Sequence, residues 1–208
     1  MNYLAHLQLA PRQADAILGA LLGDFRRHVD LSQLPPSIML GVVHHRAVDK
    51  FTDSHPLIAD MKSLFSRERR RYAGIIIDIS FDHFLSRHWR RFNTDGREEF
   101  IRYAHGCLRQ GQALLPPRMR QLLGYLIAED WLGSYAELAG VADSLDRLAR
   151  RLRFRNQLHG AIEEVHSNYL ALERGFLEFY PQLQAHMRPS SGSALVTETR
   201  REPAFHLV

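Results

Sequence analysis

The chain has 208 residues, of which 45% are hydrophobic and 24% are charged, values close to those of an ordinary globular protein. No apolar run approaches the roughly 20 residues needed to span a bilayer, and the N-terminus "MNYLAHLQLA" lacks the cationic and apolar regions of a signal peptide. The single cysteine, Cys107, excludes an internal disulfide and a cysteine-based zinc site. We therefore expect a cytoplasmic protein that has no membrane partner.

Arginine carries nearly all of the positive charge. The formal net charge is +4, and lysine occurs only at Lys50 and Lys62. Guanidinium groups bind phosphates and carboxylates in a bidentate manner, so an acidic or phosphorylated partner would suit this composition. A charge of +4 is too small for a protein that coats DNA, and we expect no nucleic-acid partner.

Apolar residues recur at helical spacing along most of the chain. In chain order, the expected helices cover residues 11–29, 35–51, 54–71, 72–92, 96–115, 116–136, 140–152 and 154–187. A short buried strand is the alternative for residues 74–79, but no second strand candidate is available to pair with it. Pro181 is expected to kink or end the last helix. The sequence predicts an all-α, single-domain bundle of about seven to eight helices over residues 1–187, with a flexible tail at 188–208.

Three of the expected helices carry ionisable side chains on the face that their apolar residues predict to be buried. These side chains are Asp24, His45, Asp49, Asp78 and Asp82. A buried carboxylate is destabilising unless it is paired or bound to a metal. A divalent ion inside a helix bundle would satisfy all five, and oxygen ligands with one or two histidines suit Mn²⁺, Mg²⁺ or Fe²⁺.

A structural network of ion pairs explains the same pattern without a metal. Arg26, Arg46 and Arg87 could neutralise these carboxylates. Periodicity alone slightly favours the network over a metal site. If a metal is present, hydrolysis is the expected chemistry, because such an ion lowers the pKa of bound water and stabilises charge on phosphoryl oxygens.

The histidines of these segments do not share one face. His44 lies about 100° around the helix from His45, so we expect His45 alone of this pair to face inward with Asp49. Asn2 and His6 lie between apolar residues, and the sequence alone favours a structural role for both.

Five segments carry a family resemblance: "MNYLAHLQLA", "LLGDF", "HHRAVDKFTDSHP", "DISFDHFLSRHW" and "FLEFYPQL". Together they resemble the acyl carrier protein phosphodiesterase family, also called ACP hydrolyase, from residue 1 to about residue 185. The resemblance implies removal of the 4′-phosphopantetheine group from holo-acyl carrier protein, with Mn²⁺ as the usual cofactor. It also implies an atypical, HD-phosphohydrolase-like fold.

The resemblance departs from typical HD enzymes at the metal ligands. Those enzymes use an adjacent His-Asp pair, whereas this chain has the reverse order at Asp82 and His83, so the ligands cannot be carried over in sequence order. The family motif positions are Asn2, His6, Asp24, His45, Arg46, Asp49, Asp53, Asp78, Asp82, His83 and Arg87.

From these positions we assign roles by helical face. We predict that Asp24, His45, Asp49, Asp78 and Asp82 are metal-site and catalytic residues, with His83 as a further acid or ligand. Arg46 and Arg87 are predicted to contact phosphate. Basic clusters would attract the acidic carrier protein; the candidates are Arg26 and Arg27, Arg69, Arg70 and Arg71 within residues 67–71, and Arg90 and Arg91.

Two other functions fit the same residues. An HD-type phosphohydrolase acting on a small nucleotide would keep the metal site and change the substrate. A non-catalytic all-α module could bind an acidic protein through its arginines, without a metal.

Overall fold

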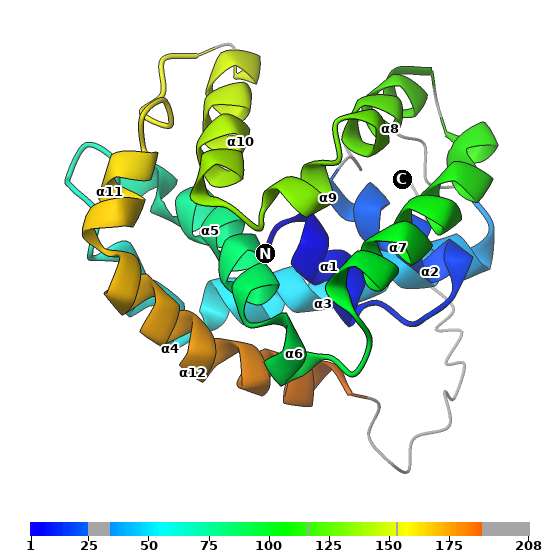
Figure 1. Ribbon diagram of the computed structural model, residues 1–208, viewed down its shortest axis with the longest axis horizontal. Helices are drawn as coiled ribbons and strands as arrows, with labels where there is room; N and C mark the ends of the chain where they lie inside the picture. Colours follow the sequence, from blue (N-terminus) through cyan, green and yellow to red (C-terminus); the bar gives the residue numbers. More distant parts are fainter. Residues whose placement is uncertain (25–33, 116, 153, 189–208) are drawn as a thin grey trace, which may run out of the picture.

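The computed structural model describes residues 1–24, 34–115, 117–152 and 154–188. Twelve α-helices and no strand occur in these ranges, so the predicted all-α class is confirmed (Figure 1). The helices are α1 (Tyr3–Leu9), α2 (Ala14–Leu22), α3 (Pro36–Ser54), α4 (Pro56–Lys62), α5 (Ala73–Arg87), α6 (Trp89–Phe92), α7 (Arg97–Gly111), α8 (Pro117–Ala128), α9 (Trp131–Ser134), α10 (Leu138–Arg151), α11 (Ile162–Ser167) and α12 (Tyr169–Met187). No helix in these ranges is both long and apolar enough to cross a membrane.

The helix count exceeds the predicted seven to eight because several helices are short. The helices α1, α4, α6, α9 and α11 have four to seven residues each, too few to display a clear period. The expected helix 72–92 divides at His88 into α5 and α6. The expected helix 154–187 divides at Asn168 into α11 and α12.

The isoleucine run and Pro181 were the two positions at which the helical prediction was in question. The isoleucine run at 74–79 is helical, as predicted, and lies in α5. Pro181 was expected to kink or end the last helix, but α12 continues through it to Met187. Buried Phe179, Tyr180 and Leu183 on both sides of the proline anchor this helix in the core. The predicted tail lies outside the described residues, apart from Arg188.

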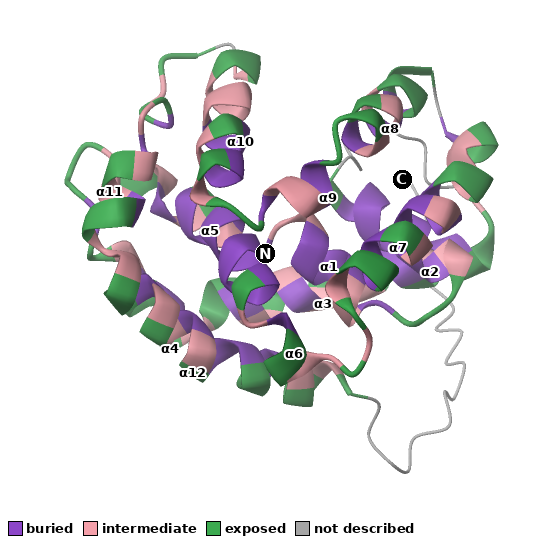
Figure 2. Cartoon of the chain, in the orientation of Figure 1, coloured by how far each residue is buried: buried purple, intermediate pink, exposed green. Residues whose placement is uncertain are grey.

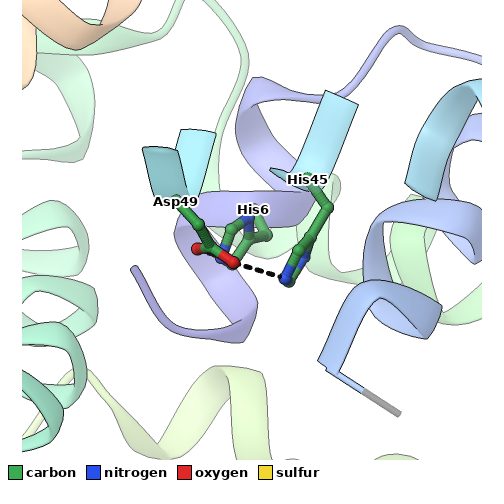
Figure 3. A group of neighbouring side chains, drawn as sticks. All are labelled: His6, His45 and Asp49. Carbon is green, nitrogen blue, oxygen red and sulfur yellow. Dashed lines mark ion pairs between the residues drawn. The ribbon is translucent and has the colours of Figure 1, made fainter. Parts of the chain in front are cut away.

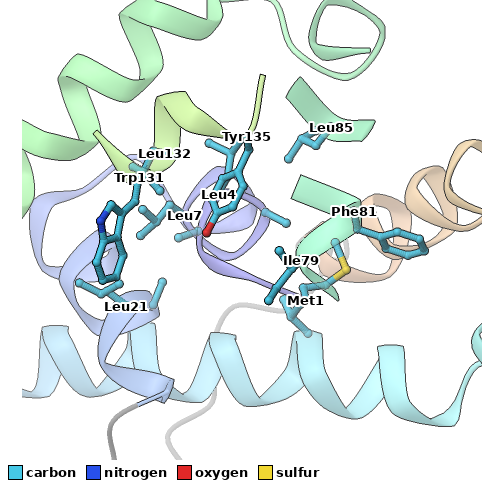
Figure 4. Close-up of a cluster of buried hydrophobic side chains, with 14 of the residues drawn as sticks. Met1, Leu4, Leu7, Leu21, Ile79, Phe81, Leu85, Trp131, Leu132 and Tyr135 are labelled. Carbon is cyan, nitrogen blue, oxygen red and sulfur yellow. The ribbon is translucent and has the colours of Figure 1, made fainter. Parts of the chain in front are cut away.

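Helix α5 is at the centre of the core. It packs against α1, α4, α10 and α12, and most of its residues from Ile76 to Ser86 are buried. Figure 2 shows this helix as one of the most deeply buried elements. One part of the core joins α5 to α1 and α9, where Leu4, Leu7, Ile79 and Tyr135 are buried (Figure 4). The apolar contacts therefore fix α1 against α5.

Two glycines allow α2 and α3 to touch backbone to backbone. A Cβ atom on Gly19 would lie 2.1 Å from the carbonyl oxygen of Ile38 and 2.8 Å from Cα of Gly41. A Cβ atom on Gly41 would lie 2.5 Å from the carbonyl oxygen of Ala16. Any larger residue would force the helices apart, so these glycines set the separation that the site described below requires.

We expect Gly19→Ala to lower the free energy of unfolding by about 1–3 kcal/mol, because overpacking a close contact costs this much. The matched control is Gly106→Ala in α7, where an added Cβ meets no described atom within 4 Å. That change should be neutral or stabilise by up to about 1 kcal/mol. Urea unfolding measures both, and equal stability of the two variants would contradict the close contact.

Candidate metal centre

Two buried imidazoles and one carboxylate converge between α1 and α3. His6 of α1 and His45 of α3 are 1% and 2% exposed, and Asp49 lies one turn after His45 on α3 (Figure 3). The ligand atoms of these three residues all lie within 4.8 Å of one another. The two rings stack with their centroids 3.7 Å apart. This is the arrangement of a candidate divalent-metal site with two nitrogen ligands and one carboxylate.

Helix α2 fixes the orientation of the His45 ring. Its Nδ1 atom lies 2.7 Å from the carbonyl oxygen of Ala20, so Nδ1–H donates a hydrogen bond and Nε2 faces the site. The ring lies directly against Gly23, where an added Cβ would approach His45 Cγ to 2.1 Å. Backbone carbonyl partners of this kind orient histidine ligands in metal sites.

The contacts of Asp49 fit a bound cation. Its Oδ2 atom lies 3.0 Å from Nε2 of His45, and its Oδ1 atom lies 3.1 Å from Nε2 of His6. Because Nδ1 of His45 already donates to Ala20, a neutral His45 ring would present a lone pair to the carboxylate. A proton or a metal ion removes that repulsion. Two ligands bound at about 2.1 Å and at right angles are about 3.0 Å apart, which matches these separations.

The charge states of the cluster also suit metal binding. Burial lowers the pKa of His6 to about 3, so its ring is neutral near pH 7. Its Nε2 atom also lies 3.1 Å from the carbonyl oxygen of Met1, so ligation through Nε2 requires the tautomer with its proton on Nδ1. Burial alone would raise the pKa of Asp49, but hydrogen bonds to His45 and His6 hold it well below its usual range. The carboxylate of Asp49 therefore stays ionised.

Asp24 and Asp78 lie at the edges of this cluster. Oδ1 of Asp24 is 3.8 Å from Nε2 of His45, and its side chain is 36% exposed. Removal of water by the surrounding protein still raises the pKa of Asp24 to about 6. Oδ1 of Asp78 lies 3.0 Å from the amino group of Met1, which is also 3.7 Å from Oδ1 of Asp49. Asp78 thus reaches the cluster through this ammonium group.

Asp82 was predicted as a metal ligand, but it lies outside the cluster. Its carboxylate is completely buried and accepts hydrogen bonds from the backbone N–H groups of Leu4 and Ala5 and from the amide of Asn2, at 2.8–3.0 Å. Burial raises the pKa of Asp82 to about 7, while these donors act in the opposite direction. Asp82 therefore anchors the first turn of α1, which carries His6.

His83 is also placed away from the cluster, although it was predicted as an acid or ligand. Its Nδ1 atom lies 3.0 Å from the carbonyl oxygen of Tyr135, and its Nε2 atom lies 3.0 Å from the hydroxyl of Tyr169. Both ring nitrogens thus join α5 to neighbouring elements, and the side chain lies about 100° around the helix from Asp82.

The predicted phosphate contacts do not converge on the cluster. Arg46 is exposed on α3, one residue and about 100° from the inward-facing His45. Nε of Arg87 lies 3.2 Å from Glu173, at the far end of α5, about 13 Å along the helix from Asp78. Neither position suits direct contact with a group bound at the cluster.

The predicted partner-binding arginines have different environments. Arg69 is held by Glu164 and by the carbonyl oxygens of Gln157 and His159, and Arg70 lies near the carbonyl oxygens of Ser63 and Phe65. Arg71 is exposed. The predictions for Arg26 and Arg27 fall outside the described residues.

His6 is the residue of the cluster to which the sequence alone assigned a structural role. It lies 39 positions from His45, on a helix of seven residues, so no local spacing relates the two. Its presence among the family motif positions was the one available signal.

The His6–His45–Asp49 cluster of this all-α protein is a candidate site for a divalent ion, and such ions in proteins commonly serve hydrolytic chemistry. Asp49 is 41% exposed, whereas both imidazoles are buried, so the cluster faces solvent on its carboxylate side.

Comparison with known proteins makes the assignment specific. The sequence profile of the acyl carrier protein phosphodiesterase family matches residues 1–183, and the chain belongs to this family of phosphodiester hydrolases. It is 39% identical over 184 residues to the acyl carrier protein phosphodiesterase of Serratia proteamaculans, with 88% of this chain and 95% of the relative covered. It is 38% identical over 186 residues to the protein of the same name from Yersinia enterocolitica, with 89% and 96% covered. No solved structure matches the chain, so the HD-like fold remains a prediction.

We expect Asp82→Ala to destabilise the protein by about 2–4 kcal/mol, because it leaves buried N–H groups of α1 without an acceptor. Asp60→Ala, at an exposed position of α4, is the control and should change stability by about 0.5 kcal/mol or less. Thermal and urea unfolding provide the measurement. A stability unchanged by Asp82→Ala would refute the anchoring role.

Gly23→Ala should weaken Mn²⁺ binding by roughly 10–100-fold, since the new methyl group must displace the His45 ring. Isothermal titration calorimetry with Mn²⁺ tests this, with Gly124→Ala, where an added Cβ has no described neighbour within 4 Å, as the control. If Gly23→Ala bound Mn²⁺ like the control, His45 would not be a ligand.

Proposed function

We propose that the protein is a metal-dependent phosphodiesterase that hydrolyses the bond between 4′-phosphopantetheine and holo-acyl carrier protein, releasing apo-acyl carrier protein. The observation that carries the proposal is the convergence of His6, His45 and Asp49 in a member of this family. The names of the relatives support the carrier protein as the substrate. The cytoplasmic location expected from the sequence is part of this proposal.

His6, His45 and Asp49 would hold the ion, with Mn²⁺ as the proposed cofactor and Mg²⁺ or Fe²⁺ as alternatives. A bound divalent ion would supply Lewis-acid stabilisation of phosphoryl oxygens and a more acidic water. The protein contributes a rigid ligand set, because Ala20 fixes the His45 ring and Asp82 fixes the helix that carries His6.

Asp24 is the residue best placed to accept a proton. It lies at the solvent-facing edge of the cluster, 3.8 Å from Nε2 of His45. Its pKa of about 6 makes it a stronger base than an ordinary aspartate while leaving it mostly ionised near pH 7. We therefore assign Asp24 as the general base for the attacking water.

Exposed arginines would attract the acidic carrier protein. Arg90 and Arg91 are exposed and line a cavity of about 470 Å³ together with Arg87 and Arg97. Clustered positive charge raises the rate of encounter with an acidic partner. We propose this surface as the contact for the carrier protein in place of Arg69 and Arg70, whose guanidinium groups contact other parts of the chain. Arg71 is a further exposed arginine, before the other end of α5.

The test is incubation with holo-acyl carrier protein and Mn²⁺, followed by mass spectrometry of the carrier protein. The wild type should release the prosthetic group, and EDTA should abolish release until Mn²⁺ is restored. His6→Ala and Asp49→Asn should each lower the rate by more than ~100-fold, since outer-shell changes at metal sites alone cost ~10–100-fold.

Asp60→Asn provides the matched control, because it removes the same charge from an exposed position outside the cluster. Persistent activity of Asp49→Asn, or activity that survives complete chelation, would contradict the proposal. Turnover of small nucleotides without turnover of holo-acyl carrier protein would favour the HD-type nucleotide hydrolase instead.

A further inference from the structure

A cavity of about 580 Å³ lies between α8, α9 and α10, next to the first residues of the chain. Its walls include the rings of Tyr3 and Trp131 and the side chains of Leu122 and Leu148. Most of its surface is apolar, and its size is within the range of small-molecule sites, about 300–1,000 Å³. The metal centre described above uses none of these four side chains.

The cavity and the metal centre share two segments of chain. Asn2 and Ile79 line the cavity, and they directly follow Met1 and Asp78, whose amino group and carboxylate form the 3.0 Å ion pair at the edge of the cluster. Consecutive Cα atoms are about 3.8 Å apart, so the cavity and the edge of the metal centre lie close together at these two segments.

Tyr3 connects the two sites electrostatically. Burial raises the pKa of its hydroxyl, the carboxylate of Asp24 raises it further, and the guanidinium groups of Arg151 and Arg147 oppose this. The charges of Asp24, at the edge of the metal centre, and of two arginines of α10 therefore both act on Tyr3, which itself lines the cavity.

Arginines of α10 bring positive charge to the cavity, where three of them outnumber the acidic lining residues Glu129 and Asp143. Arg147, Arg150 and Arg151 line the cavity. The guanidinium of Arg147 is 4.0 Å from the centre of the Trp131 ring, a cation–π contact that holds it in place. Around the metal centre the carboxylates of Asp24, Asp49 and Asp78 outnumber the single ammonium group of Met1. Guanidinium groups in the neighbouring cavity would add attraction for a phosphodiester.

We propose that this cavity binds the pantetheine arm of the substrate, with Arg147 and Arg151 oriented toward its phosphate. The inference rests on the proposed function and adds the subsite. The arm is an uncharged chain with two amides and a branched apolar segment, so it suits walls of leucine and aromatic rings with tyrosine hydroxyls to hydrogen-bond the amides.

The experiment measures binding of 4′-phosphopantetheine to the Mn²⁺-loaded protein by calorimetry. Leu122→Trp should fill the cavity and weaken binding at least 10-fold, whereas Leu170→Trp, at a 73% exposed position of α12, should leave it unchanged. Both variants must bind Mn²⁺ like the wild type to count as folded. If Leu122→Trp does not fold, Tyr125→Ala, at a half-exposed position in the cavity wall, replaces it and should weaken binding.

A second comparison tests the arginines. Arg147→Gln should reduce affinity for 4′-phosphopantetheine and change affinity for pantetheine, which lacks the phosphate, much less. The affinity for 4′-phosphopantetheine relative to that for pantetheine should fall about 10-fold. A merely structural role for Arg147 would weaken both ligands alike and would remove it from the proposal.

Failure of this subsite is distinguishable from failure of the proposed function. If the wild type hydrolyses holo-acyl carrier protein and Leu122→Trp does so at the same kcat/KM, the cavity assignment is overturned and the function stands. If the wild type does not hydrolyse the carrier protein, the function fails, and binding of 4′-phosphopantetheine that Leu122→Trp weakens would still support the subsite. If 4′-phosphopantetheine did not bind to the wild type, the proposed subsite would be overturned.

Discussion

The carboxylate of Asp82 at the start of α1 is the interaction on which the candidate site depends. Asp82 accepts hydrogen bonds from the N–H groups of Leu4 and Ala5, which no carbonyl within the helix could satisfy. A negative charge at a helix N-terminus is also favoured by the helix dipole. This anchoring from the middle of α5 fixes a helix too short to be stable alone, and with it His6.

The second constraint is the close approach of α2 and α3. Their backbones touch at Gly19 and Gly41, and Gly23 leaves room for the His45 ring. The carbonyl oxygen of Ala20 then selects the tautomer that points Nε2 toward Asp49. Two independent packing contacts therefore bring His6 and His45 together, which is the arrangement that a metal ligand set requires.

The sequence could predict those residues of the site that share one helix, but not those that tertiary packing brings together. His45 and Asp49 share one helix at i, i+4, so periodicity placed them on one face. His6 could not be paired with them from spacing, because its position depends on the docking of α1. Asp78 and Asp82 also share a face, but periodicity reports only that a side chain faces inward. It cannot distinguish a metal ion from an ammonium group or from the N–H groups of another helix, which are the partners found here.

The same limit applies to the fold. The all-α class was predictable because long helices such as α3, α5 and α12 repeat their apolar residues over several turns. The helix breaks at His88 and Asn168 could not be predicted, because the apolar pattern of the sequence continues across both residues. They are set by tertiary contacts, such as the ion pair of His88 with Glu173 and the hydrogen bond from Asn168 to the carbonyl oxygen of Leu64.

The central claim is that His6, His45 and Asp49 hold one divalent ion. The most direct measurement is anomalous scattering at the manganese edge from crystals grown with Mn²⁺. The account predicts a peak within about 2.3 Å of Nε2 of both histidines and of a carboxylate oxygen of Asp49. A manganese peak next to Asp78 and Asp82 instead would contradict this claim. So would the absence of a peak between the two imidazoles and Asp49 at saturating Mn²⁺.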